Sequence, residues 1–529
     1  MKLAFDKDYI KKITVFLFLC LLIEVYLSRY LPRLNISLFY LISSYVTIIL
    51  IFSLFLGKLI GFYFSIFFVF ILNLINRIKY KNTNEPIGYF DVASPENFSI
   101  VFNYIEYWHL IFLFLLIYAI YFLCKKGFFK KNKPISLNEI FLLIIFFSFT
   151  LPFSSTAVGK FIHGKFANVE FNSWRLDSNV RKNGLINHLY QTSKISIPLV
   201  ENVHDNNISS VYEVGPNKLG NIYFVMCESC WDENNEIGFS SDLVRKGFYY
   251  FNLISPVYGG GTVNSAFEIL TGMASKSELS GIIYQGYADL IKNDVMAYPR
   301  MLKSIGYKTF ELHHNKKTFW RRHLVSPKLG FDFFYGSESM PETSSYGFPR
   351  DHVLYEKTLS LLEEGNIGKS FYFLTTIHSH GKFVDKDGDL GLSDYSSRVK
   401  LSVEDFLSFF DNVIKKDPEA TFLFFGDHKP GMNQFFEKKG YIDNFKNWKS
   451  VGRVPAFIYS NSINSNKFKN FDGMPFYCFS YLFSSNLNGL INDSMKFLGE
   501  NNICSKNNLP KNNYIDYPND LYFKFLLKQ

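Results

Sequence analysis

The spacing of apolar residues divides the chain into two parts. Over residues 1–155, long runs of Phe, Leu, Ile and Tyr are interrupted only by short polar segments. Five runs approach or exceed the roughly 18–20 residues that a helix needs to cross a bilayer. They lie at about 13–31, 37–57, 59–76, 107–124 and 138–155. This part of the pattern predicts an α-helical membrane domain with five spans.

Basic residues near these runs predict the side of the membrane that each loop faces. Lysines gather in the N-terminal tail and in the loop at 125–133, between the fourth and fifth runs. Because positively charged loops tend to stay in the cytoplasm, both segments are expected there. Five spans with the N-terminus inside would leave residues 156–529 outside the cytoplasm. Glu24 lies within the first run. Three interpretations remain open for a carboxylate at this position: it has a function, it pairs with a neighbouring group, or it faces a polar cavity.

After residue 155, apolar and polar residues mix as they do in a water-soluble domain. Short apolar runs typical of strands lie at 221–227, 308–313, 370–376, 420–425 and 454–459. Helical patterns lie at 263–273, 297–305, 351–364 and 399–415. Their alternation predicts an α/β domain with a mainly parallel central sheet and helices on both faces.

These patterns predict four segments along the chain. The transmembrane domain covers 1–155, and a juxtamembrane connector covers 156–217. Amphipathic helices are expected in the connector, for instance near 181–192. The α/β domain covers 218–495. Residues 496–529 are rich in Lys and Asn and are expected to form a peripheral C-terminal tail.

Charge adds little to this picture, and cysteine usage adds two expectations. A net charge of +9 is modest for this length, and no basic repeat with interleaved aromatic residues suggests nucleic-acid binding. Nearby anionic lipid is a sufficient reason for the excess. Cys478 and Cys504 lie in the external part, where a disulfide is plausible. Cys227 and Cys230 are interpreted as packing residues or a local disulfide rather than a redox or zinc centre, because no second Cys pair has zinc-ribbon spacing.

Three short segments carry the chemistry. Residues 421–428 read Thr-Phe-Leu-Phe-Phe-Gly-Asp-His, an apolar strand that ends by delivering Asp427 and His428 side by side. Residues 221–228 form a similar run that ends in Glu228, and three glycines precede Thr262 at the start of a predicted helix. Taken alone, Thr262 would be an ordinary helix cap. Together the four residues are typical of a metal site that contains a nucleophile.

The predicted topology supports one shared site. In open α/β sheets, ligands bind beyond the carboxyl ends of the strands. Glu228, His314, His380 and Asp427 all fall just past the carboxyl end of a predicted strand. We therefore expect these side chains to meet at the same edge of the sheet.

Five motifs, in this order along the chain, carry a resemblance to a known family. They are Cys227-Glu228-Ser229, Gly261-Thr262-Val-Asn-Ser265, Thr318-Phe-Trp320-Arg-Arg322, Ser379-His380-Gly381 and Gly426-Asp427-His428. The chain resembles the lipoteichoic acid synthase-type phosphoglycerol transferases of the alkaline phosphatase/sulfatase superfamily. The resemblance covers nearly the whole chain. It implies a multi-pass protein of the bacterial inner (cytoplasmic) membrane with an extracytoplasmic catalytic domain.

The resemblance also implies the metal centre. Thr262 would be the nucleophile and a metal ligand, and Glu228, Asp427 and His428 would complete the ligand set of one divalent ion. A set rich in oxygen suits Mn²⁺ or Mg²⁺, while the histidine admits Zn²⁺. The resemblance favours Mn²⁺.

Headgroup recognition is assigned by the resemblance to Trp320, Arg322 and His380, with His314 at the pocket wall. Arginine suits this role because its planar group binds phosphate through two charge-assisted hydrogen bonds. Neighbouring residues remain alternatives, namely Arg321 for Arg322, His378 for His380 and His313 for His314. The sequence also departs from the family. A glutamate that the family often carries four positions after the nucleophile is Ala266 here, with Glu268 nearby.

The function implied is a membrane-bound, metal-dependent phosphotransferase. It would move the headgroup of a phospholipid, with phosphatidylglycerol favoured, through a phospho-threonine intermediate onto an envelope glycan or polymer. One alternative is a phosphoethanolamine transferase acting on lipid A or another glycan. A second is a sulfatase or phosphodiesterase, although Thr262-Val-Asn-Ser-Ala lacks the Cys/Ser-x-Pro-x-Arg context of sulfatases. A third is a scaffold without activity, which would be expected to have lost metal ligands.

Overall fold

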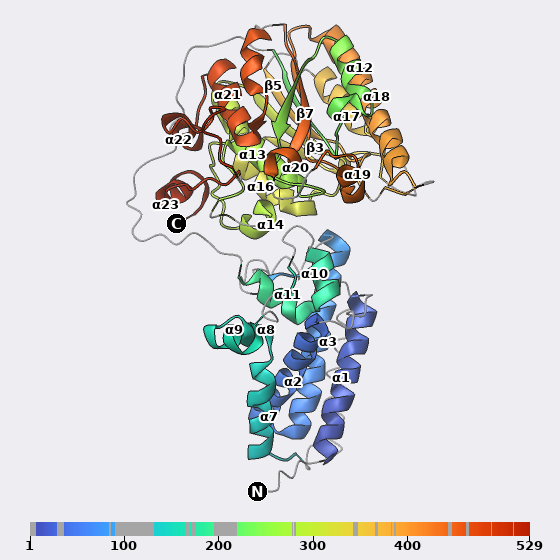
Figure 1. The fold of residues 1–529 in the computed structure, drawn as a ribbon, viewed down its shortest axis with the longest axis vertical. Coiled ribbons are helices and arrows are strands. Elements are labelled where there is room, and N and C mark those ends of the chain that lie inside the picture. Colours follow the sequence, from blue (N-terminus) through green and yellow to red (C-terminus); the bar gives the residue numbers. More distant parts are fainter. Residues whose placement is uncertain are drawn as a thin grey trace. The chain divides into compact units, whose positions relative to one another are not determined.

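The computed structural model of the chain consists of two compact units, Met1–Ile195 and Ser196–Gln529, and each is described by itself. The structure describes residues 7–28, 36–83, 86–89, 92, 132–164, 169–171, 176–194, 220–277, 279, 282–341, 348–364, 369–381, 383–385, 388–442, 447–461, 465–487, 489–511 and 513–528. Figure 1 shows how these elements are arranged within each unit.

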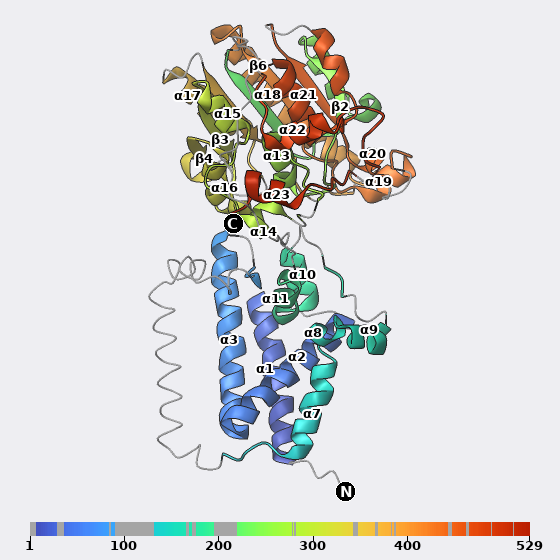
Figure 2. The same cartoon turned by 90° about the vertical axis from the view of Figure 1, so that its left-hand side faces the viewer.

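The first unit is helical. Its helices are α1 (Lys7–Ser28), α2 (Ile36–Leu56), α3 (Lys58–Thr83), α7 (Leu137–Ser148), α8 (Leu151–Ser154), α9 (Ala157–His163), α10 (Leu176–Asn183) and α11 (Leu185–Thr192). Figure 2 shows α1, α2, α3 and α7 side by side. Within the described part of the chain, two helices are long and apolar enough to cross a membrane, Ile36–Leu56 and Lys58–Lys79.

The expected five spans are therefore not confirmed. The runs at 37–57 and 59–76 correspond to the two candidate spans. The run at 13–31 forms most of α1, which is not among them, and the run at 107–124 lies outside the described residues. The run at 138–155 is divided between α7 and α8. Pro152 lies in the first turn of α8, a position that proline favours. With 12 residues, α7 is about 18 Å long, less than the hydrocarbon thickness of a bilayer.

Glu24 connects the helices of this unit. Its carboxylate accepts a hydrogen bond from Tyr45 of α2 and another from the backbone N–H of Leu185 (3.4 Å), the first residue of α11. The two short helices α10 and α11 occupy the region where amphipathic helices were expected. Of the readings left open by the sequence, local pairing of Glu24 is the one that these contacts support.

The second unit is built on one sheet. The strands are β1 (Ile222–Cys227), β2 (Tyr249–Ile254), β3 (Lys308–His313), β4 (Phe333–Tyr335), β5 (Ser370–Thr375), β6 (Thr421–Gly426), β7 (Arg453–Tyr459) and β8 (Met474–Pro475), in the order β4-β3-β5-β1-β6-β7-β2-β8. All five predicted strands are present. The sheet is mixed, because β7 runs antiparallel to both β6 and β2. Its other five strand pairings are parallel, so the sheet is mainly parallel, as predicted. The strands from β4 to β6 in this order are parallel neighbours.

Helices cover both faces of the sheet. They are α12 (Phe239–Arg245), α13 (Thr262–Thr271), α14 (Ile283–Tyr287), α15 (Tyr298–Ser304), α16 (Arg322–Leu329), α17 (His352–Glu363), α18 (Leu392–Lys416), α19 (Asn433–Lys438), α20 (Trp448–Val451), α21 (Phe476–Leu487), α22 (Asp493–Glu500) and α23 (Asn519–Leu521). Consecutive residues of β1 show the two faces. The ring of Tyr223 contacts Phe409 of α18, whereas that of Phe224 contacts Tyr298 of α15 and Phe483 of α21.

The C-terminal segment is not peripheral. Tyr517, Tyr522 and Phe525 are buried, and the hydroxyl of Tyr517 accepts a hydrogen bond from the backbone N–H of Ala274 (2.9 Å). A disulfide joins Cys478 to Cys504, the pairing that was plausible from the sequence. The abundance of Lys and Asn concealed this packing, because a few aromatic residues supply the buried contacts.

Gly426, the last residue of β6, provides a stability test of the packing at the site edge. A Cβ atom at this position would lie 2.0 Å from the backbone oxygen of Cys230. We predict that Gly426→Ala lowers the free energy of unfolding by about 1–3 kcal/mol, because the backbone must move. Gly431→Ala is the control, since its Cβ would meet ordinary contacts at 3.8 Å. Equal unfolding curves for the two variants would contradict the prediction.

Candidate active site

The parallel pairing of β1 with β6 brings the predicted metal ligands together. Cys227 lies opposite Gly426 in this pairing, so Glu228 and Asp427 leave the sheet next to each other. Ligand atoms of Glu228, Asp427 and His428 all lie within 4.8 Å of one another, and the three residues are buried. Thr262 joins them from the first position of α13, and its Oγ1 donates a hydrogen bond to Glu228 Oε2 (3.1 Å).

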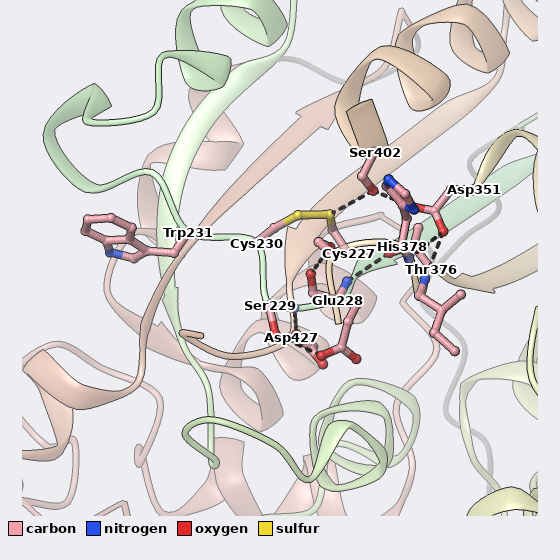
Figure 3. The surroundings of a disulfide bond; sticks show 12 residues. Cys227, Glu228, Ser229, Cys230, Trp231, Asp351, Thr376, His378, Ser402 and Asp427 are labelled. Atoms are coloured by element: carbon pink, nitrogen blue, oxygen red, sulfur yellow. Dashed lines mark hydrogen bonds between the residues drawn. A yellow bond between two sulfur atoms is a disulfide. The ribbon is translucent and has the colours of Figure 1, made fainter. Parts of the chain in front are cut away.

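A disulfide between Cys227 and Cys230 closes the turn that carries Glu228. Ser229 adopts a left-handed backbone conformation (φ 55°), and its N–H donates to Asp427 Oδ1 (2.7 Å). Figure 3 shows the carboxylates of Glu228 and Asp427 pointing together, away from the disulfide. Of the readings left open for the two cysteines, the structure has the local disulfide.

The glycine turn before Thr262 allows a close backbone approach. Gly259 and Gly261 have φ of 67° and 89°, in the left-handed region where glycine is favoured. The N–H of Gly259 donates to the carbonyl of Lys429 (3.0 Å), directly after the Asp-His pair. One turn into α13, Ser265 Oγ donates to the backbone oxygen of Asp427 (2.8 Å). These contacts attach the Thr262 helix to the end of β6, and no motif considered from the sequence assigned Ser265 that role.

The ionisable groups at this centre alter one another's pKa. Burial acts to raise the pKa of Glu228, but His380, His428 and hydrogen bonds from Ser229 and Thr262 lower it below its usual range. Burial and the neighbouring Glu228 charge raise the pKa of Asp427 to about 7. Although burial lowers the pKa of His428, the two carboxylates raise it above its ordinary value. The centre therefore has more negative charge than its single imidazole can balance.

Two orphaned atoms indicate that a cation fits here. Asp427 Oδ2 and His428 Nε2 are buried without a hydrogen-bond partner. The Nδ1 of His428 lies 2.9 Å from the carbonyl of Lys429, which can only accept, so Nδ1 carries a proton. Nε2 is therefore the nitrogen through which the neutral ring would bind a cation. That Nε2 lies 3.3 Å from Asp427 Oδ2 and 3.6 Å from Glu228 Oε1. Two carboxylates, one imidazole and one hydroxyl suit a divalent metal ion.

The arginine pair lies at a backbone kink, because Trp320 and Arg321 both have φ near 55° (56° and 55°). Arg322 is fully buried, and its Nη1 donates to Glu311 Oε1 (2.9 Å), while its Nε and Nη2 have no hydrogen-bond partner. Arg321 instead pairs with Asp289 (2.7 Å). Trp320 is half-buried and contacts Phe319, with no described contact to Thr262 or its partners. Of the two arginines, Arg322 is the one with buried, unsatisfied donors.

The histidines separate by position. His313 is the last residue of β3, and its Nδ1 lies 2.9 Å from the carbonyl of Thr375. Burial and the nearby Arg322 charge lower its pKa well below the usual range. His314 follows the strand, and its Nδ1 is buried without a partner. Burial also lowers the pKa of His314. His313 is thus held by the sheet, and His314 has the available ring nitrogen.

His378 and His380 do not share a strand face. The strand β5 ends at Thr375, so both histidines lie in the following loop. The ring of His378 lies 3.4 Å from the carbonyl of Phe348, whereas the His380 charge acts on Glu228. Nδ1 of His380 is buried without a partner. Of the two histidines, His380 is the one whose charge lowers the pKa of Glu228.

Metal binding gives a direct test of the ligand set. We predict that Mn²⁺ or Zn²⁺ stabilises the full-length protein against unfolding, by about 2.7 kcal/mol at a hundredfold excess over Kd. Asp427→Asn should weaken the affinity at least about tenfold, because it removes a charged ligand. Asp405→Asn, which alters a carboxylate bound to Arg350, is the matched control. An unchanged affinity in Asp427→Asn, measured by titration calorimetry, would disprove the ligand set.

Glu268 lies elsewhere on α13 and gives a pH prediction. Its carboxylate is buried and accepts from the N–H (2.8 Å) and Oγ (2.9 Å) of Ser275, and burial raises its pKa from 4.5 to about 8. Because the folded state holds this proton more tightly, its stability should fall as pH rises from about 4.5 to 8. We predict that Glu268→Gln makes the unfolding free energy less pH-dependent, by up to about 1.4 kcal/mol per pH unit. Denaturant titrations at pH 5 and 8 measure this. An unchanged pH slope would contradict it.

Comparison with known proteins found a matching family and two curated relatives. Residues 221–473 match the family model Sulfatase. The chain is 27% identical over 241 residues to "Putative cyclic beta-1,2-glucan modification protein" of Rhizobium meliloti (strain 1021), covering 41% of this chain and 37% of the relative. It is 26% identical over 209 residues to "Capsular polysaccharide biosynthesis protein RkpI" of the same organism, covering 37% of each. The chain thus spans well under half the length of these relatives.

A solved structure with similarity is the lipoteichoic acid synthase LtaP from Listeria monocytogenes, at 23% identity and a TM-score of 0.42, covering 53% of this chain and 76% of that one. The family match covers β1, β6 and α13, the elements that carry Glu228, Asp427, His428 and Thr262. Residues 221–473 of the second unit therefore match the sulfatase family, in agreement with the alkaline phosphatase/sulfatase superfamily predicted from the sequence motifs.

Proposed function

We propose that this protein is a membrane-bound, metal-dependent transferase that moves the phosphoglycerol headgroup of phosphatidylglycerol onto a hydroxyl of an envelope glycan or polymer. The observation that carries the proposal is the hydrogen bond from Thr262 Oγ1 to Glu228 Oε2 (3.1 Å), beside the orphaned atoms of Asp427 and His428. A hydroxyl is a weak nucleophile until a base or a metal activates it. Here Glu228 is the proposed base, and Glu228, Asp427 and His428 are the proposed ligands of the metal.

The chain's own residues account for the first half-reaction. A divalent cation held by Glu228, Asp427 and His428 would lower the pKa of the Thr262 hydroxyl and offset charge on the phosphate. Thr262 Oγ1 bonds to phosphorus while the bond from phosphorus to the diacylglycerol oxygen breaks. The hydroxyl proton passes to Glu228, towards which it already points. The departing oxygen takes a proton from His380, and phosphoglyceryl-threonine remains.

The second half-reaction reverses these roles. An acceptor hydroxyl gives its proton to His380 and attacks phosphorus. The bond from phosphorus to Thr262 Oγ1 breaks, and Glu228 returns the proton to that oxygen. Each half-reaction therefore forms one P–O bond and breaks another. After both half-reactions, Glu228 and His380 have returned to their starting protonation states.

Arg322 is the proposed phosphate-binding residue. A guanidinium is always charged, and its Nε and Nη2 are buried without partners. Unpaired buried donors are unfavourable, so an anion that accepts from both would be bound strongly. His314, with its buried and unpartnered Nδ1, is proposed at the wall of the same pocket, and Trp320 is proposed to contact the glycerol.

The carboxylates near the arginines favour phosphoglycerol over phosphoethanolamine. An ammonium headgroup needs a carboxylate that is free to bind it. Glu311 is bound by Arg322 (2.9 Å), and Asp289 by Arg321 (2.7 Å). An ammonium would therefore compete with an arginine at either position, whereas glycerol hydroxyls would not.

The acceptor and location rest on separate observations. The names of both curated relatives refer to polysaccharides, one to glucan modification and one to capsule biosynthesis. This supports a glycan acceptor. The two candidate spans α2 and α3 support membrane anchoring close to a lipid donor. We propose a bacterial inner membrane location with the sulfatase-family domain outside the cytoplasm.

Hydrolysis is the second candidate function, because the family match is to the sulfatases. The nucleophile position argues against a sulfatase. Thr262 is followed by Val-Asn-Ser, without the Cys or Ser and the downstream Pro and Arg that sulfatases use. A phosphodiesterase would use the same threonine and transfer the headgroup to water.

Adduct formation tests the proposal. Full-length protein in detergent with Mn²⁺ is offered phosphatidylglycerol or phosphatidylethanolamine, and peptide mass is measured. We predict a phosphoglycerol adduct on Thr262 and release of diacylglycerol, with turnover falling at least about a thousandfold in Thr262→Ala.

Thr271→Ala, at the other end of the same helix, is the matched control and should retain the adduct. A phosphoethanolamine adduct alone would replace the donor and keep the mechanism. Free glycerol phosphate in the presence of glycan, without transfer to it, would identify a hydrolase. Neither adduct nor diacylglycerol with either lipid would overturn the proposal.

A further inference from the structure

The loop of residues 376–380, which follows β5, holds the backbone of Glu228 from both sides. Thr376 Oγ1 accepts a hydrogen bond from the Glu228 N–H (2.9 Å), and Ser379 Oγ donates to the Glu228 carbonyl. The N–H of Thr376 also donates to the carbonyl of Met226 (3.1 Å). The loop that carries His380 is therefore attached directly to the turn that carries a proposed metal ligand.

Asp351 anchors this loop from the opposite side. It directly precedes α17 and is fully buried. Its Oδ1 accepts from the N–H groups of Ile377 (2.9 Å) and His378 (3.1 Å), and its Oδ2 accepts from Ser402 Oγ of α18. Figure 3 shows the Asp351 carboxylate next to His378, with Ser402 close to it. One carboxylate thus satisfies two consecutive amides of a loop that has no regular secondary structure.

The remaining contacts of the loop determine where His380 lies. Its N–H donates to the carbonyl of Ile377 (3.0 Å), and its own carbonyl accepts from Arg398 Nη1 (3.3 Å). With residues 377 and 378 fixed by Asp351, the turn that follows places Ser379 against the Glu228 carbonyl and His380 directly after it. Without that acceptor, two buried amides would be unsatisfied, and the loop would rearrange to reach water or other acceptors.

We propose that Asp351 is a positioning residue that orients His380 through the loop 376–380. This rests on the proposed function, in which His380 exchanges protons with the leaving and attacking oxygens. Asp351 itself touches neither substrate nor Thr262. A burial this complete is unfavourable for a carboxylate unless its hydrogen bonds compensate, and three donors supply that compensation. Two of these three donors are backbone amides of the loop.

Kinetics in the full-length protein separate positioning from a general structural role. Asp351→Ala should lower kcat about 10–100-fold, the effect typical of a residue that orients a catalytic partner, with KM for the lipid changed much less. Asp351→Asn should restore most of the rate, because an amide oxygen still accepts from both backbone N–H groups. Asp405→Ala is the matched control. Asp405 binds Arg350 and the N–H of His352 at the same helix start but does not contact the loop, so kcat should be retained.

A double-mutant cycle tests the route through His380. In a His380→Ala background, Asp351→Ala should cause little further loss, because the group that it positions is absent. Additive losses, or an unchanged kcat in Asp351→Ala, would overturn the proposal. If Asp351→Ala does not fold, Ser402→Ala, which removes the hydroxyl that donates to Asp351, is judged by the same criterion.

Hydrogen exchange tests the anchor independently of the reaction. The amides of residues 377 and 378 should exchange slowly in the wild type and at least tenfold faster in Asp351→Ala, while Asp405→Ala leaves them unchanged. Equal protection in all three proteins would overturn the positioning role. Failure of the wild type to transfer any headgroup, with the exchange result as expected, would instead reject the proposed function.

Discussion

The active centre depends on the register between two parallel strands. Because Cys227 lies opposite Gly426, Glu228 and Asp427 leave the sheet as neighbours. Side chains alternate between the faces of a sheet, so a shift of one residue would turn one of these carboxylates away from the other. The helix that begins at Thr262 and the loop after β5 both attach to this pair of strand ends. Their positions therefore follow from the register.

The proposed metal site and the proposed phosphate-binding residue Arg322 have opposite imbalances of charge. At the proposed metal site, two buried carboxylates face one imidazole, and protonation of Asp427, favoured by its raised pKa, partly compensates for the missing positive charge. At Arg322, one carboxylate satisfies one nitrogen of the guanidinium and leaves the other donors without partners. A phosphodiester bound to a cation complements both, since it offers anionic oxygens to each.

Strands that are apolar throughout were readily predicted from the sequence. β1, β5 and β6 are buried on both faces, so their residues form continuous runs, and Glu228, His380 and Asp427, which follow these strands, could be assigned to the site edge. Two of the missed strands, β4 and β8, have three and two residues, too few for a pattern. The antiparallel direction of β7 was also missed, because direction is set by connections between elements rather than by composition.

The site residues also separate into those that the sequence predicted and those that it did not. The motifs predicted that Glu228, Thr262, Asp427 and His428 form one site, because their chemistry is recognisable in the residues themselves. The roles of Ser265 and Asp351 could not be predicted, since each acts through a backbone group distant in sequence. The division of the fifth apolar run into α7 and α8 was hidden for a related reason. Hydropathy measures how apolar a segment is, and helix ends are set by local hydrogen bonds.

The disulfide between Cys227 and Cys230 has a consequence for how the protein matures. Its two cysteines lie on either side of Glu228, so the disulfide cross-links the turn that presents this carboxylate. The reduced form, with two free thiols, lacks this cross-link. Disulfides persist in oxidising compartments and are rare in the cytosol. A newly made chain would thus hold two free thiols on either side of Glu228. If the domain is exported as proposed, oxidation outside the cytoplasm would close the turn, and assembly of the proposed site would be tied to export.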